Sequence, residues 1–185
     1  MSINCSQALG GIQLDCETSQ GGIKKVFIAR YSDVDEVEYD KATGEITGIT
    51  KVSGATGPIF YAYNFRKGTG SMTSTLTADE SAGINYVTTE LSLVFTRQDT
   101  KKRLEMAALS LNQMVVIVLD NNGQYHYLGY DDYVSASNGG ANTGTAKGEQ
   151  NAYTLTLKDE SSSYPYMLSE AFAETFETSE LVKQQ

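Results

Sequence analysis

A two-residue alternation of side chains, present over 71–78 and again over 85–96, constrains the fold of this chain more than any other feature. In the first segment, one set of alternate positions is wholly hydroxylic. In the second, the apolar residues share one face: Val87, Leu91, Leu93 and Phe95. A period of two is typical of β-strands that bury a single face. The polar stretch 79–83 predicts a turn, so we expect a long antiparallel hairpin over about 71–97.

The other face of this predicted hairpin carries hydroxyl groups and one carboxylate. Its members are Ser71, Thr73, Thr75, Thr77, Thr88, Glu90 and Ser92. The face offers no cluster of cations with which to hold nucleic acid. We predict that these residues line or close an interface between subunits.

The one convincing helical pattern follows the hairpin, at about 99–112. Asp99 and Thr100 suit an N-cap. Apolar side chains recur at helical spacing, at Leu104, Ala107, Ala108 and Leu111. This spacing predicts that one face of the helix is buried against a sheet.

Positive charge gathers at the start of this helix, where the helix dipole disfavours it. The residues are Arg97, Lys101, Lys102 and Arg103. The segment 33–40 carries carboxylates and no cation, at Asp33, Asp35, Glu36, Glu38 and Asp40. We predict that the two segments meet, either within one subunit or across an interface. A calcium loop is excluded at 33–40, because Glu38 stands where such a loop needs glycine.

The remaining segments complete a β-rich pattern. The run 114–119 is apolar throughout and predicts a central strand. The sequence DNNG at 120–123 predicts a hairpin turn, and 151–157 predicts a final strand. We expect the Gly-rich segment 135–146 to be a flexible loop.

Composition narrows the class of protein further. A length of 185 residues predicts one domain, 1–185, with an N-terminal arm at 1–23 and a C-terminal arm or short helix at 164–185. A net charge of −9 disfavours a nucleic-acid-binding surface. We expect no membrane helix, no signal peptide and free thiols at Cys5 and Cys16.

No motif for catalysis, metal binding or cofactor binding emerges. The chain has a single histidine, His126, in an alternating run where a surface or cross-strand role is expected. Two cysteines and one distant histidine cannot complete a zinc site. We therefore expect no enzyme and no cofactor. The predicted fold is mainly β: two packed antiparallel sheets, a β-sandwich or partial barrel, flanked by the helix at about 99–112.

The order of local motifs resembles a known family. After the long hairpin come TKKRLEMAAL at 100–109, VVIVLD at 115–120, NGQYHYLGY at 122–130, TGTAKGE at 143–149 and NAYTLTL at 151–157. Over about 70–160 the chain resembles the tail-tube-like structural proteins of bacteriophages and prophages, particularly those of Bacteroides-type hosts.

The resemblance implies an assembly subunit with no enzymatic activity. Such proteins form rings, commonly hexameric, that stack into a tube, and their long hairpins join into a barrel through which DNA passes without specific binding. The implied partners are further copies of the chain and other tail, baseplate or connector proteins. The implied location is the virion, after assembly in the bacterial host cytoplasm.

Two other classes of function stay open. The first is a monomeric β-sandwich module that binds carbohydrate or protein, since Tyr-rich strands suit such a groove. The second is a hydrolase with an unrecognised carboxylate site.

Overall fold

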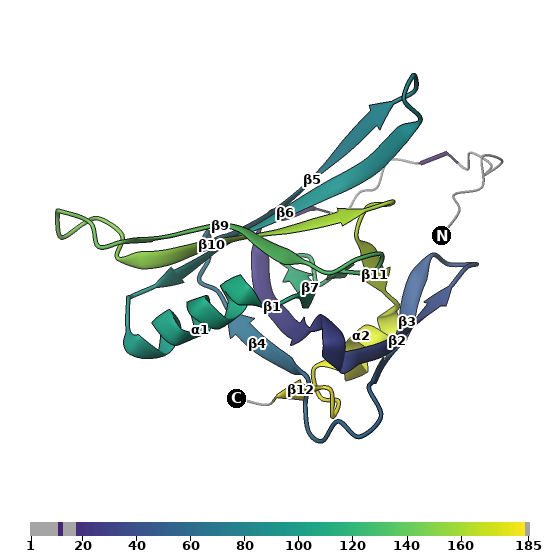
Figure 1. Cartoon of the computed structure of the whole chain (residues 1–185), viewed down its shortest axis with the longest axis horizontal. Coiled ribbons are helices and arrows are strands. Elements are labelled where there is room, and N and C mark those ends of the chain that lie inside the picture. Colours follow the sequence, from purple (N-terminus) through teal and green to yellow (C-terminus); the bar gives the residue numbers. More distant parts are fainter. Residues whose placement is uncertain (1–10, 13–17, 184–185) are drawn as a thin grey trace.

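Two β-sheets form most of the structure, a computed structural model that describes residues 11–12 and 18–183 (Figure 1). The large sheet has eight strands in the order β12-β4-β1-β7-β8-β11-β3-β2, and the small sheet has four in the order β5-β6-β10-β9. The predicted fold class, mainly β with two packed sheets, is confirmed.

The elements have the following bounds. The strands of the large sheet are β1 Ile23–Arg30, β2 Val34–Asp40, β3 Glu45–Lys51, β4 Phe60–Asn64, β7 Met114–Asp120, β8 Tyr125–Leu128, β11 Tyr166–Leu168 and β12 Val182–Lys183. Those of the small sheet are β5 Gly70–Asp79, β6 Ile84–Thr96, β9 Ser135–Asn142 and β10 Ala152–Ser161. The helices are η1 Tyr31–Asp33, α1 Thr100–Leu111 and α2 Glu170–Phe176.

Strand β7 lies at the centre of the large sheet, between β1 and β8. Val116 and Val118 point into a core shared with the small sheet, where they meet Leu91 and Leu155 among others. The alternate side chains of β7 point into a second core on the other face of the large sheet. A strand covered on both faces has no position for a polar side chain. The prediction of a central strand at 114–119 is therefore confirmed.

The predicted hairpin is formed by β5 and β6, and its register unites the two apolar sets on one face. Met72 pairs with Leu91, and Leu76 pairs with Val87. The hairpin extends past the body of the molecule (Figure 1). The side chains of the hairpin become less buried toward its tip. Leu91 is 0% exposed, whereas Leu76, nearer the tip, is 48% exposed.

Helix α1 begins where the sequence predicts. Asp99 is its N-cap, and the Asp99 carboxylate accepts a hydrogen bond of 2.8 Å from the backbone N–H of Lys102. The predicted buried stripe is wrong, however, since Leu104 is 59% and Leu111 is 87% exposed. The helix instead packs Leu109 and Met106 against the core between the sheets. Apolar residues lie on both sides of α1, so periodicity alone did not identify the covered side.

The Gly-rich segment predicted as a loop contains strand β9, which pairs with β10 at the edge of the small sheet. A Cβ atom at Gly139 would lie 3.3 Å from the carbonyl oxygen of Thr154, and one at Gly140 would lie 3.3 Å from the Thr154 hydroxyl. Absence of side chains at 139 and 140 thus permits the strand to lie close to β10.

The segment predicted as a C-terminal arm or short helix does contain a short helix, and it is also part of the large sheet and its second core. It contains β11, α2 and β12, and Phe176 of α2 is 0% exposed. The Phe176 ring meets the rings of Phe27 and Phe60 edge-on, with centroid distances of 5.2 and 5.4 Å. Most of the predicted N-terminal arm, 1–10 and 13–17, lies outside the described residues.

Candidate assembly surfaces

The hydroxylic face of the hairpin exists as predicted. Its members are Ser71, Thr73, Thr75, Thr77, Thr88, Glu90 and Ser92, all exposed except the half-buried Thr88. The strand register places them on one side of β5 and β6, directly opposite the buried side. The prediction that they share one face is confirmed, and their role in an interface stays a prediction.

Strand β10 extends this face with residues that were not predicted. Thr156 pairs with Ser92, and Lys158 pairs with Glu90. The Lys158 ammonium lies 2.7 Å from the carboxylate of Glu160, and this contact raises the pKa of Lys158. The alternation of the predicted strand 151–157 could have revealed Thr156 as an outward residue. The extended face is therefore mainly polar, with its cation paired, and it carries the exposed Tyr86 and Ile84 near the hairpin tip.

Both edges of the small sheet are open within the described residues. Strand β5 pairs only with β6, and strand β9 pairs only with β10. The edges are 10 and 8 residues long, respectively. An exposed strand edge presents unpaired backbone N–H and C=O groups and can pair with another strand.

Lys102, one of the predicted basic residues, is bound within the chain at the junction between β6 and α1. The Lys102 ammonium donates to the carbonyl oxygens of Thr96 at 2.7 Å and Arg97 at 2.9 Å, and lies 3.3 Å from the Asp99 carboxylate. The backbone N–H of Lys102 lowers the pKa of Asp99, and its ammonium adds to that effect. Lys102 thus stabilises its own junction. Arg97 has a left-handed φ of 65° there.

Lys101 and Arg103 are both exposed. No salt bridge found among the described residues includes either of them. Their positive charge is available to a partner.

The acidic segment divides into two parts. Asp33 belongs to η1 and lines the same groove as Lys101 and Lys102. Asp35, Glu36 and Glu38 are exposed on β2, the outer strand of the large sheet. Helix α1 and β2 lie on opposite sides of the molecule (Figure 1).

No salt bridge joins these acidic and basic segments within the described residues. The intramolecular alternative is therefore wrong for the carboxylates of β2. A meeting across an interface stays a prediction.

A groove of about 1030 Å³ runs between α1 and strands β1 and β4. Its lining includes Tyr61, Tyr63 and Phe95, together with the carboxylates of Asp33 and Glu105. The Tyr63 hydroxyl donates to Glu105, and burial, followed by this contact, raises the pKa of Tyr63. The lining also includes four cations, Arg30, Lys101, Lys102 and Lys183, so the groove combines aromatic, acidic and basic groups, which suits a polar ligand better than an apolar one.

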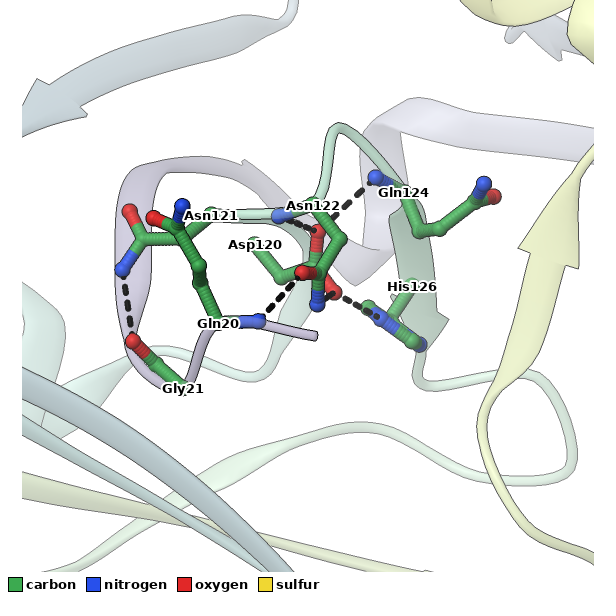
Figure 2. Close-up of polar contacts among 7 residues, drawn as sticks. All are labelled: Gln20, Gly21, Asp120, Asn121, Asn122, Gln124 and His126. Atoms are coloured by element: carbon green, nitrogen blue, oxygen red, sulfur yellow. Dashed lines mark hydrogen bonds and ion pairs between the residues drawn. The ribbon is translucent and has the colours of Figure 1, made fainter. Parts of the chain in front are cut away.

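His126 lies beside the β7–β8 turn, where Figure 2 shows a network centred on Asp120. The Asp120 carboxylate accepts 2.8 Å hydrogen bonds from the backbone N–H groups of Asn122 and Gln124 and lies 3.5 Å from the His126 ring. Burial would raise the pKa of Asp120, but these contacts outweigh it and lower the pKa.

The same turn holds the chain that enters β1. The Gln20 N–H donates to the Asn122 side chain, and the Asn121 amide donates to the carbonyl oxygen of Gly21, each at 2.7 Å (Figure 2). In the described chain no serine hydroxyl is hydrogen-bonded to His126, so this network fastens a turn and does not form a nucleophilic triad.

Two further features bear on other classes of function. The described part of the chain brings together no group of three or more His, Cys, Asp or Glu residues that could hold a metal ion. None of its helices is long and apolar enough to cross a membrane. Cys5 and Cys16 lie outside the described residues.

No protein-family model matches this chain, and no curated protein matches it.

Proposed function

We propose that this chain is a structural subunit that assembles through its small sheet into a ring or tube segment, as in bacteriophage tails. The observation that carries the proposal is the hairpin β5–β6, which extends past its own core. Leu76, on the apolar face near its tip, is 48% exposed. A two-stranded ribbon without a covered face is marginal in water. A neighbouring subunit would cover it.

The directions of the strands support closure of the small sheet between copies. Successive strands in the order β5-β6-β10-β9 are antiparallel, so β5 and β9 run in opposite directions. Rotation about an axis parallel to the strands preserves these directions. The β9 edge of one copy then meets the β5 edge of the next as an antiparallel pair, and each copy contributes the same two edges around the ring.

The chemistry of the polar face of the small sheet supports the proposal that this face lines the channel. It presents hydroxyl groups, the exposed carboxylate of Glu90 and a lysine paired with Glu160. Such a surface stays hydrated and offers DNA few unpaired cations. We place this face toward the lumen, where DNA passes without specific binding. The station of the ring in the tail is left open among tube, terminator, hub ring and connector.

Light scattering and negative-stain imaging of the purified chain test the proposal. We expect rings or tubes. The variant Leu76→Lys/Ala78→Lys, at two exposed positions on the apolar face of the hairpin, is expected to need about tenfold more protein to assemble, because it places charge in a contact that must become dry. The exposure of both positions predicts an unchanged monomer fold.

A matched control adds the same charge elsewhere. Ala171→Lys/Glu174→Gln changes two exposed positions on α2 and should assemble like the wild type. A chain that stays monomeric at high concentration would contradict the proposal.

The groove between α1 and β4 favours one alternative, a monomeric module that binds carbohydrate or protein. Tyr61 and Tyr63 supply aromatic surface there, and Glu105 supplies a hydrogen-bond acceptor. A persistent monomer that binds a glycan or peptide, and loses binding in Tyr61→Ala, would support this alternative.

A further inference from the structure

The exposed side of α1 is an apolar surface that the chain itself does not cover. Leu104 and Leu111 are 59% and 87% exposed, and Ala107 lies between them on the same side of the helix. At 3.6 residues per turn, Leu109 and Met106 point the opposite way, into the core. Leucine side chains that gather on one exposed side of a helix form a candidate surface for contact with another molecule.

Positive charge flanks this apolar surface. Lys101 and Arg103 lie on either side of Leu104 by helical position, and both are exposed. Lys102 does not contribute, because its ammonium binds the carbonyl oxygens of Thr96 and Arg97. The surface formed by Lys101, Arg103, Leu104, Ala107 and Leu111 is called the α1 surface below.

A complementary surface lies on the outer strand of the large sheet. Val37 of β2 packs toward the second core, whereas Asp35, Glu36 and Glu38 are exposed. Val52, which follows β3, is 37% exposed and adds a small apolar contribution. The β2 edge is open within the described residues. These residues form the β2 surface.

Within one molecule no salt bridge joins the described residues of the two surfaces, and most of β2 lies across the molecule from α1 (Figure 1). Complementary surfaces on opposite sides of one chain join copies head to tail, and a repeated contact of this kind builds a ring or a filament. Nucleic acid is a poorer occupant of the α1 surface, because the chain carries a net charge of −9.

We propose that the α1 surface of one copy docks on the β2 surface of a second copy of this chain. Lys101 and Arg103 meet the carboxylates of Asp35 and Glu36, and Leu104 and Leu111 are covered at the contact. This rests on the proposed assembly function and adds a second contact to the one between the edges of the small sheet.

Charge reversal tests the contact in the full chain. Lys101→Glu/Arg103→Glu is expected to raise the protein concentration for half-assembly about tenfold at low salt, where charge pairing is least screened. Adding Asp35→Lys/Glu36→Lys to that variant exchanges the signs of both surfaces and should restore assembly to within about threefold of wild type. Lys102 is left unchanged because of its role at the junction.

Two further variants test whether the loss of assembly is specific to this contact. Lys67→Glu/Lys147→Glu makes the same change in net charge at other exposed positions and should assemble like the wild type. Leu104→Ser/Leu111→Ser should weaken assembly at any salt concentration without changing the thermal melting of the monomer, since both leucines are exposed.

The outcomes separate this contact from the proposed function. Wild-type assembly with unchanged assembly of Lys101→Glu/Arg103→Glu overturns the contact alone. Failure of the exchanged-sign variant to recover overturns the pairing with β2. A wild-type chain that never assembles overturns the proposed function, and the contact with it.

Discussion

Asp159 is the clearest case of a single residue whose environment conflicts with its charge. It is 3% exposed on β10, and its carboxylate accepts a 3.1 Å hydrogen bond from the backbone N–H of Gly129. Burial raises the pKa of Asp159 to about 6, against the effect of that hydrogen bond, and the nearby Asp131 and Asp132 add to the increase.

This pKa predicts how stability depends on pH. The folded state holds the Asp159 proton more tightly than the unfolded state, whose pKa is 3.8. The contribution of this group to stability is therefore full below about pH 4 and is lost as pH rises through about 6.

Asp159→Asn should accordingly stabilise the protein at pH 7 to 8 by on the order of 1–3 kcal/mol, because the amide oxygen can still accept from Gly129. The gain should vanish near pH 4. Chemical denaturation at both pH values measures it, with Glu180→Gln, at an exposed position, as the control. A gain that is equal at pH 4 and pH 8 would be incompatible with this account.

At the scale of elements, the hairpin β5–β6 combines a buried base with an uncovered tip. Leu91 and Leu93 are 0% exposed in the core between the sheets, while Leu76 is 48% exposed. The same alternation in sequence thus serves burial at one end and, in the proposed assembly, contact with a neighbour at the other.

Two substitutions with the same chemistry separate these roles. Leu91→Ala should lower the free energy of unfolding of the monomer by about 2–5 kcal/mol, because it leaves a cavity in a packed core. Leu76→Ala should lower it by less than about 1 kcal/mol, since the side chain already meets solvent. Denaturant titration under monomeric conditions compares them. Equal losses would show that the tip is covered within one chain.

In helix α1, the sequence predicted the N-cap but not which side of the helix is buried. The N-cap at Asp99 is local, because the side chain and the N–H that it binds are three residues apart, and it was predictable. The covered side of the helix depends on where the two sheets lie. Leu109, not Leu104 or Leu111, meets that core.

At the scale of the whole molecule, the polar face of the small sheet determines how the proposed channel treats DNA. Thr75→Lys/Thr77→Lys would add two unpaired cations per subunit at exposed positions on that face. Tubes or rings of this variant are expected to retain DNA in a filter-binding assay at low salt and release it as salt increases. Wild-type assemblies should not retain it.

A control for that experiment places the same charge away from the proposed lumen. Ala171→Lys/Glu174→Gln on α2 should leave DNA retention at the wild-type level. Equal retention by both variants would mean that net charge, and not the channel face, is responsible.

The sequence alone determined features that depend on near neighbours: the alternation of the hairpin, the cap at Asp99, the turn at 120–123 and the central strand at 114–119. Each is specified by side chains within one or two turns or strands. The hydroxylic face follows directly from the alternation, so the sequence alone identifies its residues.

Only the tertiary structure decided features that depend on distant segments. It placed Leu104 and Leu111 in solvent, set the Gly-rich segment beside β10 as a strand, and put Phe176 against Phe27 and Phe60 in the second core. Burial is a property of the whole packed chain, since the same apolar residue can be covered by a remote strand or left for a partner. The tertiary structure likewise leaves the carboxylates of β2 without a salt bridge to the basic segment among the described residues.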